Sequence, residues 1–202
     1  MNVVGFREDS TLFTSLLKFY QNKENKLQEL RLATGYLNLT KDYTSLINGL
    51  PAKTHILTAS PKANGFYKSG FIKKYIPGLY RMKAIEMLSK SKNVEIHEYT
   101  NGDWTYHAKG AWFYEEDEAN GPVMSVIGSS NLSNRSIKLD TELQLYLVSE
   151  CESFKQRLHQ EQKHLFDKAP SQSIQDLLDK EGCQYKITWR EKVMSKMLKY
   201  IL

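Results

Sequence analysis

The chain is organised around one stretch, residues 106–142, which reads YHAKGAWFYEEDEANGPVMSVIGSSNLSNRSIKLDTE. Five side chains in this stretch carry groups suited to phosphoryl chemistry: His107, Lys109, Ser129, Asn131 and Glu142. An imidazole can attack phosphorus or transfer protons, and ammonium, hydroxyl and amide groups can hold phosphoryl oxygens. A carboxylate can orient an imidazole from behind. Together these groups predict attack on a phosphodiester without a metal ion.

The spacing within this stretch places the polar groups in two pairs. His107 and Lys109 are two residues apart, so they point the same way on the strand expected over residues 104–114, because side chains alternate between faces along a strand. Ser129 and Asn131 are also two apart and follow an apolar run. Two neighbouring strands would therefore carry both pairs.

A turn signal lies between the two strands of the stretch. Residues 120–122 read Asn-Gly-Pro, which predicts a hairpin with its loop at residues 115–122. Glu142 opens a third apolar run, residues 143–148. The acidic residues 115–118 fit a solvated loop tip better than a cation site, because they lack the ligand spacing of such a site.

Strand and helix patterns alternate along the rest of the chain. Helical spacing or helix-starting residues are present at residues 11–20, 43–48, 77–88, 154–165 and 171–180, and strand-like runs at 31–39, 54–59 and 94–99. Gly35 in the first run marks a close approach of two backbones. The mixture predicts an α/β fold with a mixed central sheet flanked by helices.

Length and composition limit the class of protein to which the chain can belong. The 202 residues are enough for one sizeable domain, and 41% hydrophobic with 25% charged residues describes an ordinary globular protein. An apolar run of about 18 residues is lacking, so a transmembrane helix is not expected. The first residues resemble neither a signal peptide nor a transit peptide. Cys151 and Cys183 are expected to be packing residues rather than a disulfide.

The net charge of +5 is concentrated near the C-terminus. Residues 183–202 hold five basic residues and a single acid, Glu191. Thr188 and Glu191 fit a capping box at the start of an amphipathic helix. Two interpretations stay open: a helix docked on the core, or a helix lying in a membrane interface with its lysines toward anionic headgroups.

The polar residues of the stretch resemble the HKD motif of the phospholipase D superfamily: His-x-Lys, Gly-Ser-x-Asn, and Glu eleven residues after the Asn. The usual motif has an Asp five residues after the Lys, where this chain has Tyr114. The chain looks closest to the eukaryotic mitochondrial phosphatidylglycerophosphate synthases, a branch that also lacks the Asp. The other similar segments are ATGYLNLT (33–40), ASPKANGF (59–66) and LHQEQ (158–162). The resemblance covers nearly the whole chain but matches only the second half of that family.

This resemblance implies a phospholipase D-like half-domain over residues 1–182, followed by the basic helix at 183–202. It implies transfer of a phosphatidyl group from CDP-diacylglycerol to the 1-hydroxyl of glycerol 3-phosphate, with release of CMP and without a metal or other cofactor. His107 would be the general acid–base, and Glu142 would fix its tautomer. Candidates to hold phosphoryl oxygens or a headgroup are Lys109, Ser129, Asn131, Arg135 and Asn64. For Arg135 the closing of a loop, and for Asn64 a simple turn, are equally good interpretations.

The implied chemistry needs two histidines, one to attack phosphorus and one to move protons. The chain holds one such motif, and its other histidines (His55, His97, His159 and His164) are interpreted as structural or exposed. It would therefore pair with a copy of itself or, the interpretation we favour, with a first-half domain of the same longer protein. The basic C-terminal end favours an anionic membrane surface or nucleic acid as a partner, and of these we expect the membrane and no nucleic acid. The resemblance implies a peripheral place on the mitochondrial inner membrane.

Two other functions remain open. One is a homodimeric single-motif nuclease or phosphodiesterase of the same superfamily, which the overall basic charge would suit. The other is a non-catalytic half that binds lipid or a partner. Turnover by the lone chain, and its dependence on concentration, would separate them.

Overall fold

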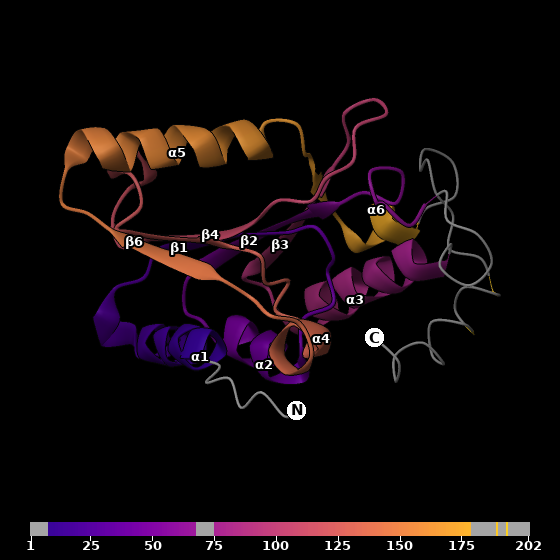
Figure 1. Ribbon diagram of the computed structural model, residues 1–202, viewed down its shortest axis with the longest axis horizontal. Coiled ribbons are helices and arrows are strands. Elements are labelled where there is room, and N and C mark those ends of the chain that lie inside the picture. The colour runs from indigo at the N-terminus through magenta and orange to yellow at the C-terminus, as the bar shows by residue number, and fades with distance from the viewer. Residues whose placement is uncertain (1–7, 68–74, 179–188, 190–192, 194–202) are drawn as a thin grey trace.

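The computed structural model describes residues 8–67 and 75–178, together with Trp189 and Val193. Within this part, a seven-stranded sheet has the strand order β6-β5-β4-β1-β2-β3-β7 and carries helices on both faces (Figure 1). The expected α/β fold with a mixed central sheet is confirmed. Each described helix is too short or too polar to cross a membrane.

The sheet combines a parallel centre with antiparallel flanks. The parallel strands are β1 (Glu29–Thr34), β2 (Lys53–Ala59) and β3 (Val94–Tyr99). The antiparallel strands are β4 (Lys109–Tyr114), β5 (Met124–Gly128), β6 (Gln144–Val148) and β7 (Ser171–Gln172). The expected hairpin is confirmed, because β4 pairs directly with β5.

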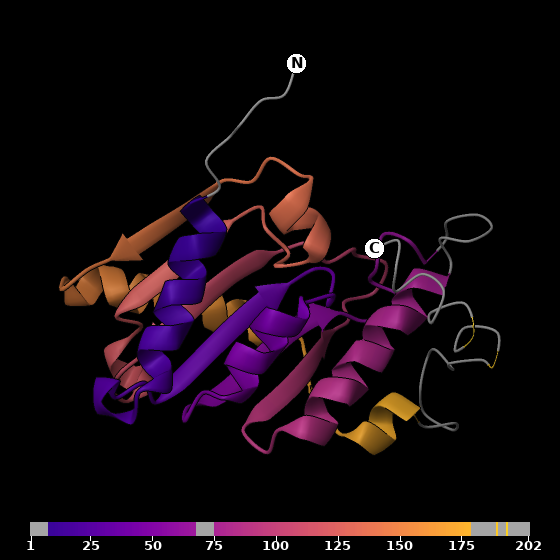
Figure 2. The same cartoon turned by 90° about the horizontal axis from the view of Figure 1, so that it is seen from below.

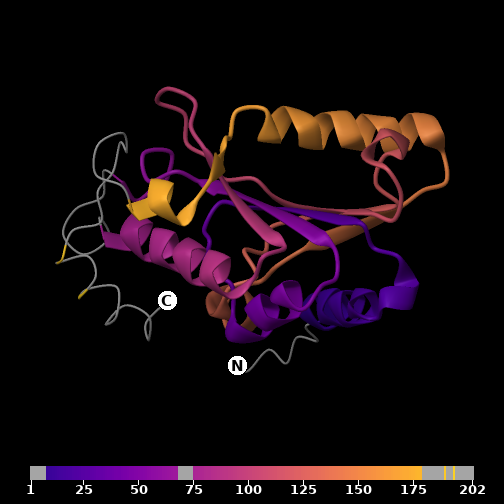
Figure 3. The same ribbon diagram turned by 180° about the vertical axis from the view of Figure 1, so that it is seen from behind.

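The helices form a layer on each side of the sheet. They are α1 (Glu8–Gln21), α2 (Lys41–Asn48), α3 (Ile76–Lys90), α4 (Asn134–Lys138), α5 (Glu152–Phe166) and α6 (Ile174–Leu178), with 3-10 turns η1 (Lys23–Asn25) and η3 (Glu118–Asn120). Figure 2 shows α1, α2 and α3 lying across one face. Figure 3 shows α5 along the opposite face.

The alternation of side chains along each strand fills both layers. Leu30, Leu32 and Ile56 point to the α1–α3 side and belong to the main hydrophobic core. Their neighbours Ala33 and Leu57 point to the α5 side and belong to smaller clusters there. Both faces of the central strands are therefore covered, as is typical of parallel strands, although polar side chains such as Arg31, His55 and His97 lie on the α5 side.

A buried ion pair joins α3 to β3. Nε and Nη2 of Arg81 donate to the two carboxylate oxygens of Glu98 at 3.0 and 2.6 Å. The two residues are only 4% and 7% exposed. The two-pronged geometry satisfies both carboxylate oxygens, which a charge in this environment requires.

Several expected element limits were wrong. The first strand was expected to reach residue 39, but β1 ends at Thr34, where its pairing with β4 also ends. The strand expected over residues 104–114 begins only at Lys109, the residue that pairs with Thr34, so His107 lies before it. The helix expected over residues 171–180 is the short strand β7 followed by α6.

The predictions for the two cysteines and the C-terminal helix fall partly on described residues. Cys151 is exposed rather than packed, because it precedes the first turn of α5 at the surface. Cys183 and most of the expected basic helix lie outside the described residues. Trp189 and Val193 are helical and exposed.

We expect Arg81→Met to lower the free energy of unfolding by roughly 3–5 kcal/mol, because it leaves the Glu98 carboxylate buried without its ion-pair partner. Urea denaturation measures the change. Replacing Glu98 by Met in the same chain should recover much of the loss, because both buried charges are then gone. The control Lys90→Met, in the exposed pair with Glu86, should cost about 1 kcal/mol or less. An Arg81→Met effect no larger than this control would contradict the expectation.

Candidate active site

A cavity of about 650 Å³ opens where β1 ends, β4 begins and the β5–α4 loop turns. Its lining comprises Tyr36, Asn38, Phe66, Tyr80, His107, Lys109, Ser129, Asn131, Ser133, Arg135, Ser136, Leu139, Asp140, Thr141 and Glu142. Six of the seven candidate residues from the sequence therefore share one cavity. The exception is Asn64.

The His107 backbone lies directly against Gly35. A Cβ atom on Gly35 would stand 3.0 Å from Cα and 3.2 Å from Cδ2 of His107, closer than ordinary van der Waals contact. The close approach expected at Gly35 is therefore confirmed. Because a side chain at this position would displace the imidazole, the glycine helps to set where His107 lies.

An aromatic wall borders the imidazole. The ring centroid of Tyr36 lies 5.1 Å from that of His107 in an edge-to-face arrangement. Tyr36 also stacks on Tyr80 at 5.7 Å and contacts Phe66 at 5.2 Å. Sequence reasoning missed both tyrosines as site residues. Tyr36 lies in the similar segment 33–40, which is a usable signal, whereas Tyr80 is indistinguishable from a core residue of α3 in the sequence.

Lys109 reaches back along the chain toward His107. Its Nζ donates to the backbone oxygen of His107 at 3.0 Å and lies 5.8 Å from the Tyr36 ring centroid. Burial lowers the pKa of Lys109 below its ordinary value, and the Glu142 carboxylate acts in the opposite direction. The cavity thus holds a partly desolvated ammonium group, which attracts anions more strongly than a fully hydrated one.

Glu142 contacts Ser129 rather than His107. The Ser129 hydroxyl donates to Oε2 of Glu142 and accepts from the backbone N–H of Leu143 at 3.1 Å. Among the described residues, Glu142 therefore orients Ser129, and its expected contact behind the imidazole is not observed. Glu142 precedes β6, which is separated from β4 by β5.

The loop after β5 is held in an unusual conformation. Leu132 adopts a left-handed backbone with φ of 56°, which costs an L-residue about 1–2 kcal/mol. The turn presents the amide oxygen Oδ1 of Asn131 to the hydroxyl of Thr34 at 3.4 Å. The backbone N–H of Asn131 donates to Oγ of Ser136 at 3.2 Å. Asn131 is therefore fixed at the cavity wall from both sides.

Arg135 and Asn64 differ in position. Arg135 is exposed at the cavity mouth, and its Nε donates to the Asp140 carboxylate at 3.0 and 3.1 Å. Asn64 is buried, and its Oδ1 accepts from the backbone N–H of Phe66 at 2.9 Å. This contact favours the turn interpretation of Asn64, whereas Arg135 remains able to meet an anion entering the cavity.

Tyr114 lies at the far end of β4 from the cavity. It is fully buried under α5, with Oη donating to Oε1 of Gln162 at 3.2 Å and lying 3.2 Å from Nδ1 of His159. The Arg31 guanidinium also donates to Gln162, at 2.6 Å. The similar segment LHQEQ therefore forms part of the polar contact that holds α5 on the sheet, and His159 is structural, as interpreted.

The surroundings of His107 favour the neutral form of its imidazole. Burial lowers its pKa below the ordinary value, and the neighbouring Lys109 ammonium lowers the pKa further. Near neutral pH the ring therefore carries a free lone pair. Such an imidazole can accept a proton or attack an electrophile.

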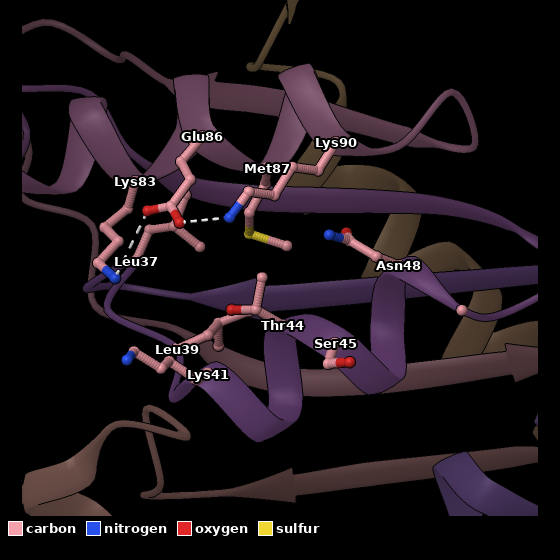
Figure 4. A pocket seen from close by; sticks show the side chains of 11 residues that line it. Leu37, Leu39, Lys41, Thr44, Ser45, Asn48, Lys83, Glu86, Met87 and Lys90 are labelled. Atoms are coloured by element: carbon pink, nitrogen blue, oxygen red, sulfur yellow. Dashed lines mark hydrogen bonds and ion pairs between the residues drawn. The ribbon is translucent and has the colours of Figure 1, made fainter.

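A second cavity, of about 420 Å³, lies between α2 and α3 (Figure 4). Lys83 and Lys90 border it, and both pair with Glu86, at 3.8 and 2.7 Å. Leu37 and Met87 supply apolar lining. Its described lining contains neither a histidine nor a cysteine, so the first cavity is the better candidate for chemistry.

Comparisons with known proteins show the family of the chain. The family model described as "Cardiolipin synthase, PLD-like domain" matches residues 27–169. The mitochondrial CDP-diacylglycerol–glycerol-3-phosphate 3-phosphatidyltransferase of Bos taurus is 40% identical over 144 residues, covering 68% of this chain and 26% of the relative. The enzyme of the same name from Gallus gallus is 38% identical over 172 residues, covering 82% and 30%. The chain thus spans less than a third of the length of these relatives.

Solved structures share the fold. The phosphatidylserine synthase of Haemophilus influenzae Rd KW20 matches with a TM-score of 0.73 at 21% identity, covering 98% of this chain and 43% of that chain. NucT from Helicobacter pylori matches with a TM-score of 0.52 at 12% identity, covering 83% and 95%. The match covers less than half of the phosphatidylserine synthase chain and nearly all of the NucT chain.

We expect an NMR titration to give His107 a pKa below the ordinary histidine value of about 6.5. Lys109→Met should raise this pKa only partway, because it removes the smaller cause and leaves burial in place. The matched control Lys90→Met, on an exposed part of α3, should leave it unchanged. A pKa at or above 6.5 in the unmodified chain would contradict the described environment.

Proposed function

Because this chain belongs to the phospholipase D-like domain family, we propose that it forms one half of the active site of a phosphatidyltransferase. The complete enzyme transfers a phosphatidyl group from CDP-diacylglycerol to the 1-hydroxyl of glycerol 3-phosphate. The names of the Bos taurus and Gallus gallus relatives support these substrates. Since the chain spans only 26% and 30% of those relatives, the activity requires a further part that supplies the other half.

One observation carries the proposal: a single imidazole lies in a cavity with an ammonium, a guanidinium, a hydroxyl and an amide. These groups belong to His107, Lys109, Arg135, Ser129 and Asn131. Two cations and several hydrogen-bond donors suit the negative charge of a phosphodiester and of glycerol 3-phosphate. The other four histidines of the sequence do not line this cavity, so the second imidazole of a double displacement must come from another domain or another copy of the chain.

In the proposed first step, the partner imidazole attacks the phosphorus that carries the diacylglycerol. A nitrogen–phosphorus bond forms, and the bond from that phosphorus to the CMP oxygen breaks. CMP leaves as a phosphate monoester whose second pKa is about 6, so it needs little protonation near neutral pH. A strongly acidic His107 is therefore not required in this step.

In the proposed second step, His107 acts as the general base. It accepts the proton of the glycerol 3-phosphate hydroxyl while the oxygen of that hydroxyl attacks phosphorus and the nitrogen–phosphorus bond breaks. A lowered pKa keeps His107 neutral, which suits this step at physiological pH. Turnover should accordingly decline as pH falls through that pKa, because the protonated ring cannot accept the proton.

The remaining polar groups position the phosphoryl oxygens. Lys109 and the Asn131 amide group hold the non-bridging oxygens, while Arg135 at the mouth meets the phosphate of glycerol 3-phosphate. Ser129 joins them when its single hydroxyl hydrogen turns from Glu142 to the substrate. We assign Glu142 to the positioning of Ser129, since its carboxylate accepts that hydroxyl. Its negative charge also favours the protonated, cationic form of Lys109.

We infer that the first-half domain docks along β6 and the cavity rim. β6 is an edge strand of the sheet. Four large apolar side chains in and before it are 56–79% exposed: Leu139, Leu143, Leu145 and Val148. Leu139 also lines the cavity, so a domain covering this edge would bring its own residues to the incomplete site. By the names of the relatives, the assembled enzyme is mitochondrial, and we place it peripherally on the inner membrane.

A second candidate is a phosphodiesterase assembled from two copies of this chain. The match to NucT, of which 95% is covered, is compatible with it in one respect: this fold occurs in a chain of similar size. The two candidates differ in what completes the site: a first-half domain or an identical chain.

We expect the isolated chain to be a monomer by light scattering and inactive with CDP-diacylglycerol and glycerol 3-phosphate in mixed micelles. Adding a first-half domain that carries its own histidine should restore turnover. In that complex His107→Asn should lower kcat about 10²–10⁴-fold, the usual contribution of general acid–base catalysis. The control His164→Ala, on the exposed surface of α5, should not change it. An active homodimer that cleaves a nucleic-acid phosphodiester would instead establish the second candidate.

Gly35→Ala should lower kcat by up to about 100-fold, because the added methyl group displaces His107 by a fraction of an ångström or more. The control is Gly65→Ala, whose Cβ would meet only Tyr36 Oη at an ordinary 3.4 Å. Circular dichroism and thermal melting check that both variants fold. An unchanged kcat in Gly35→Ala would show that this glycine does not help to position His107.

A further inference from the structure

Three metal-ligating side chains converge on the α5 face of the sheet, away from the residues of the candidate active site. His55 on β2 lies directly opposite Glu95 on β3, and His97 follows two residues later on the same face. Nδ1 of His55 is 3.1 Å from Nε2 of His97 and 3.3 Å from Oε2 of Glu95. Nε2 of His97 is 3.8 Å from Oε2 of Glu95.

The hydrogen-bond partner of His97 determines its tautomer. Nδ1 of His97 is 3.1 Å from the backbone oxygen of Ala169. A carbonyl oxygen only accepts hydrogen bonds, so Nδ1 must carry the hydrogen. Nε2 of His97 therefore directs a lone pair at His55 and Glu95.

The surroundings of His55 favour the same arrangement. Its Nε2 faces Oε1 of Glu29 at 3.7 Å, and a carboxylate attracts the N–H form of that nitrogen. Nδ1 of His55 then also presents a lone pair. In this tautomer two nitrogen lone pairs and one carboxylate oxygen of Glu95 converge with separations of 3.1, 3.3 and 3.8 Å, an arrangement that a cation between them would stabilise. A divalent metal ion binds neutral imidazoles, and it satisfies all three groups at once.

We propose that His55, Glu95 and His97 form a Zn²⁺ site. Zn²⁺ binds imidazole nitrogens at about 2.0–2.1 Å and carboxylate oxygens at about 2.0–2.2 Å, so the ligand atoms of a tetrahedral site stand roughly 3.3–3.5 Å apart. The three observed separations, 3.1, 3.3 and 3.8 Å, bracket this value. The Glu95 side chain is 37% exposed, which leaves room for water as the fourth ligand.

Outer contacts support each ligand. The Ala169 carbonyl orients His97, and Glu29 stands behind His55, as carboxylates and carbonyls do behind metal-bound histidines. Nζ of Lys53 lies 3.0 Å from Oε1 of Glu95, which leaves Oε2 for the ion. The nearest other cation, Arg31, is engaged by Glu29, Gln162 and Glu118.

The bound ion would link two strands and, through His97, the segment after α5. None of the three ligands lines the candidate active site, so the proposal does not depend on the proposed transferase. Its expected effect is on stability.

The test is equilibrium dialysis of the full chain against micromolar Zn²⁺ alone, with the bound metal measured by atomic emission. We expect about one Zn²⁺ per chain and a higher melting temperature that EDTA reverses. His97→Gln and Glu95→Gln should each weaken binding by at least about tenfold, and Glu29→Gln by about 10–100-fold as an outer partner. His164→Ala is the control for loss of a surface histidine. Co²⁺ in place of Zn²⁺ should show the visible absorption of a four-coordinate site.

Two results would overturn the proposal. One is absence of bound Zn²⁺ in the folded, unmodified chain under these conditions. The other is retention of Zn²⁺ by both His97→Gln and Glu95→Gln while His107→Asn loses it, which would assign the metal to the other cavity. Circular dichroism of each variant separates lost binding from lost folding, and two independent ligand variants keep the test valid if one fails to fold.

Discussion

β4 runs antiparallel to β1, and the last pair of that ladder joins Thr34 to Lys109. Beyond this pair both chains leave the sheet together, so Gly35 meets His107 and Tyr36 lies beside its ring. The lysine is the final residue of the ladder, and the histidine lies two residues beyond it. The segment before β4 is not a strand, but it is held in place because the sheet fixes Lys109 and Gly35 packs against His107. A rigid scaffold positions functional groups at its edge in this way.

The two faces of the sheet carry different kinds of interior. The α1–α3 side is apolar except for a few polar groups such as the Arg81–Glu98 pair. The α5 side contains small apolar clusters surrounded by polar contacts, among them Tyr114 with Gln162 and His55 with His97. Tyr114 stands five residues after Lys109, where the usual HKD motif has an aspartate, and it contacts α5 through Gln162. The departure from the usual pattern thus alters the packing beneath a helix, at the opposite end of β4 from the cavity.

Sequence reasoning predicted the parts of the site that local spacing encodes. His107 with Lys109, and Ser129 with Asn131, are pairs two residues apart, and a turn signal shows that their segments are neighbours. Tyr80 could not be predicted, because its approach to Tyr36 depends on how α3 crosses the sheet. The Glu142 contact was also missed, since strand order decides which side chain a loop residue reaches. The limits of β1 and β4 follow from where their ladder ends, which apolar runs do not specify.

The two edges of the sheet are unequal, and this limits how copies or partners can assemble. β6 offers five residues along one edge, whereas β7 covers the other edge with only two and is followed at once by α6. Head-to-tail growth into a fibre requires two open edges that match each other. Within the described residues only one extended edge is available, so edge association ends after a single pairing. A polypeptide that pairs with β6 therefore meets no second extended edge, within the described residues, on which the assembly could grow.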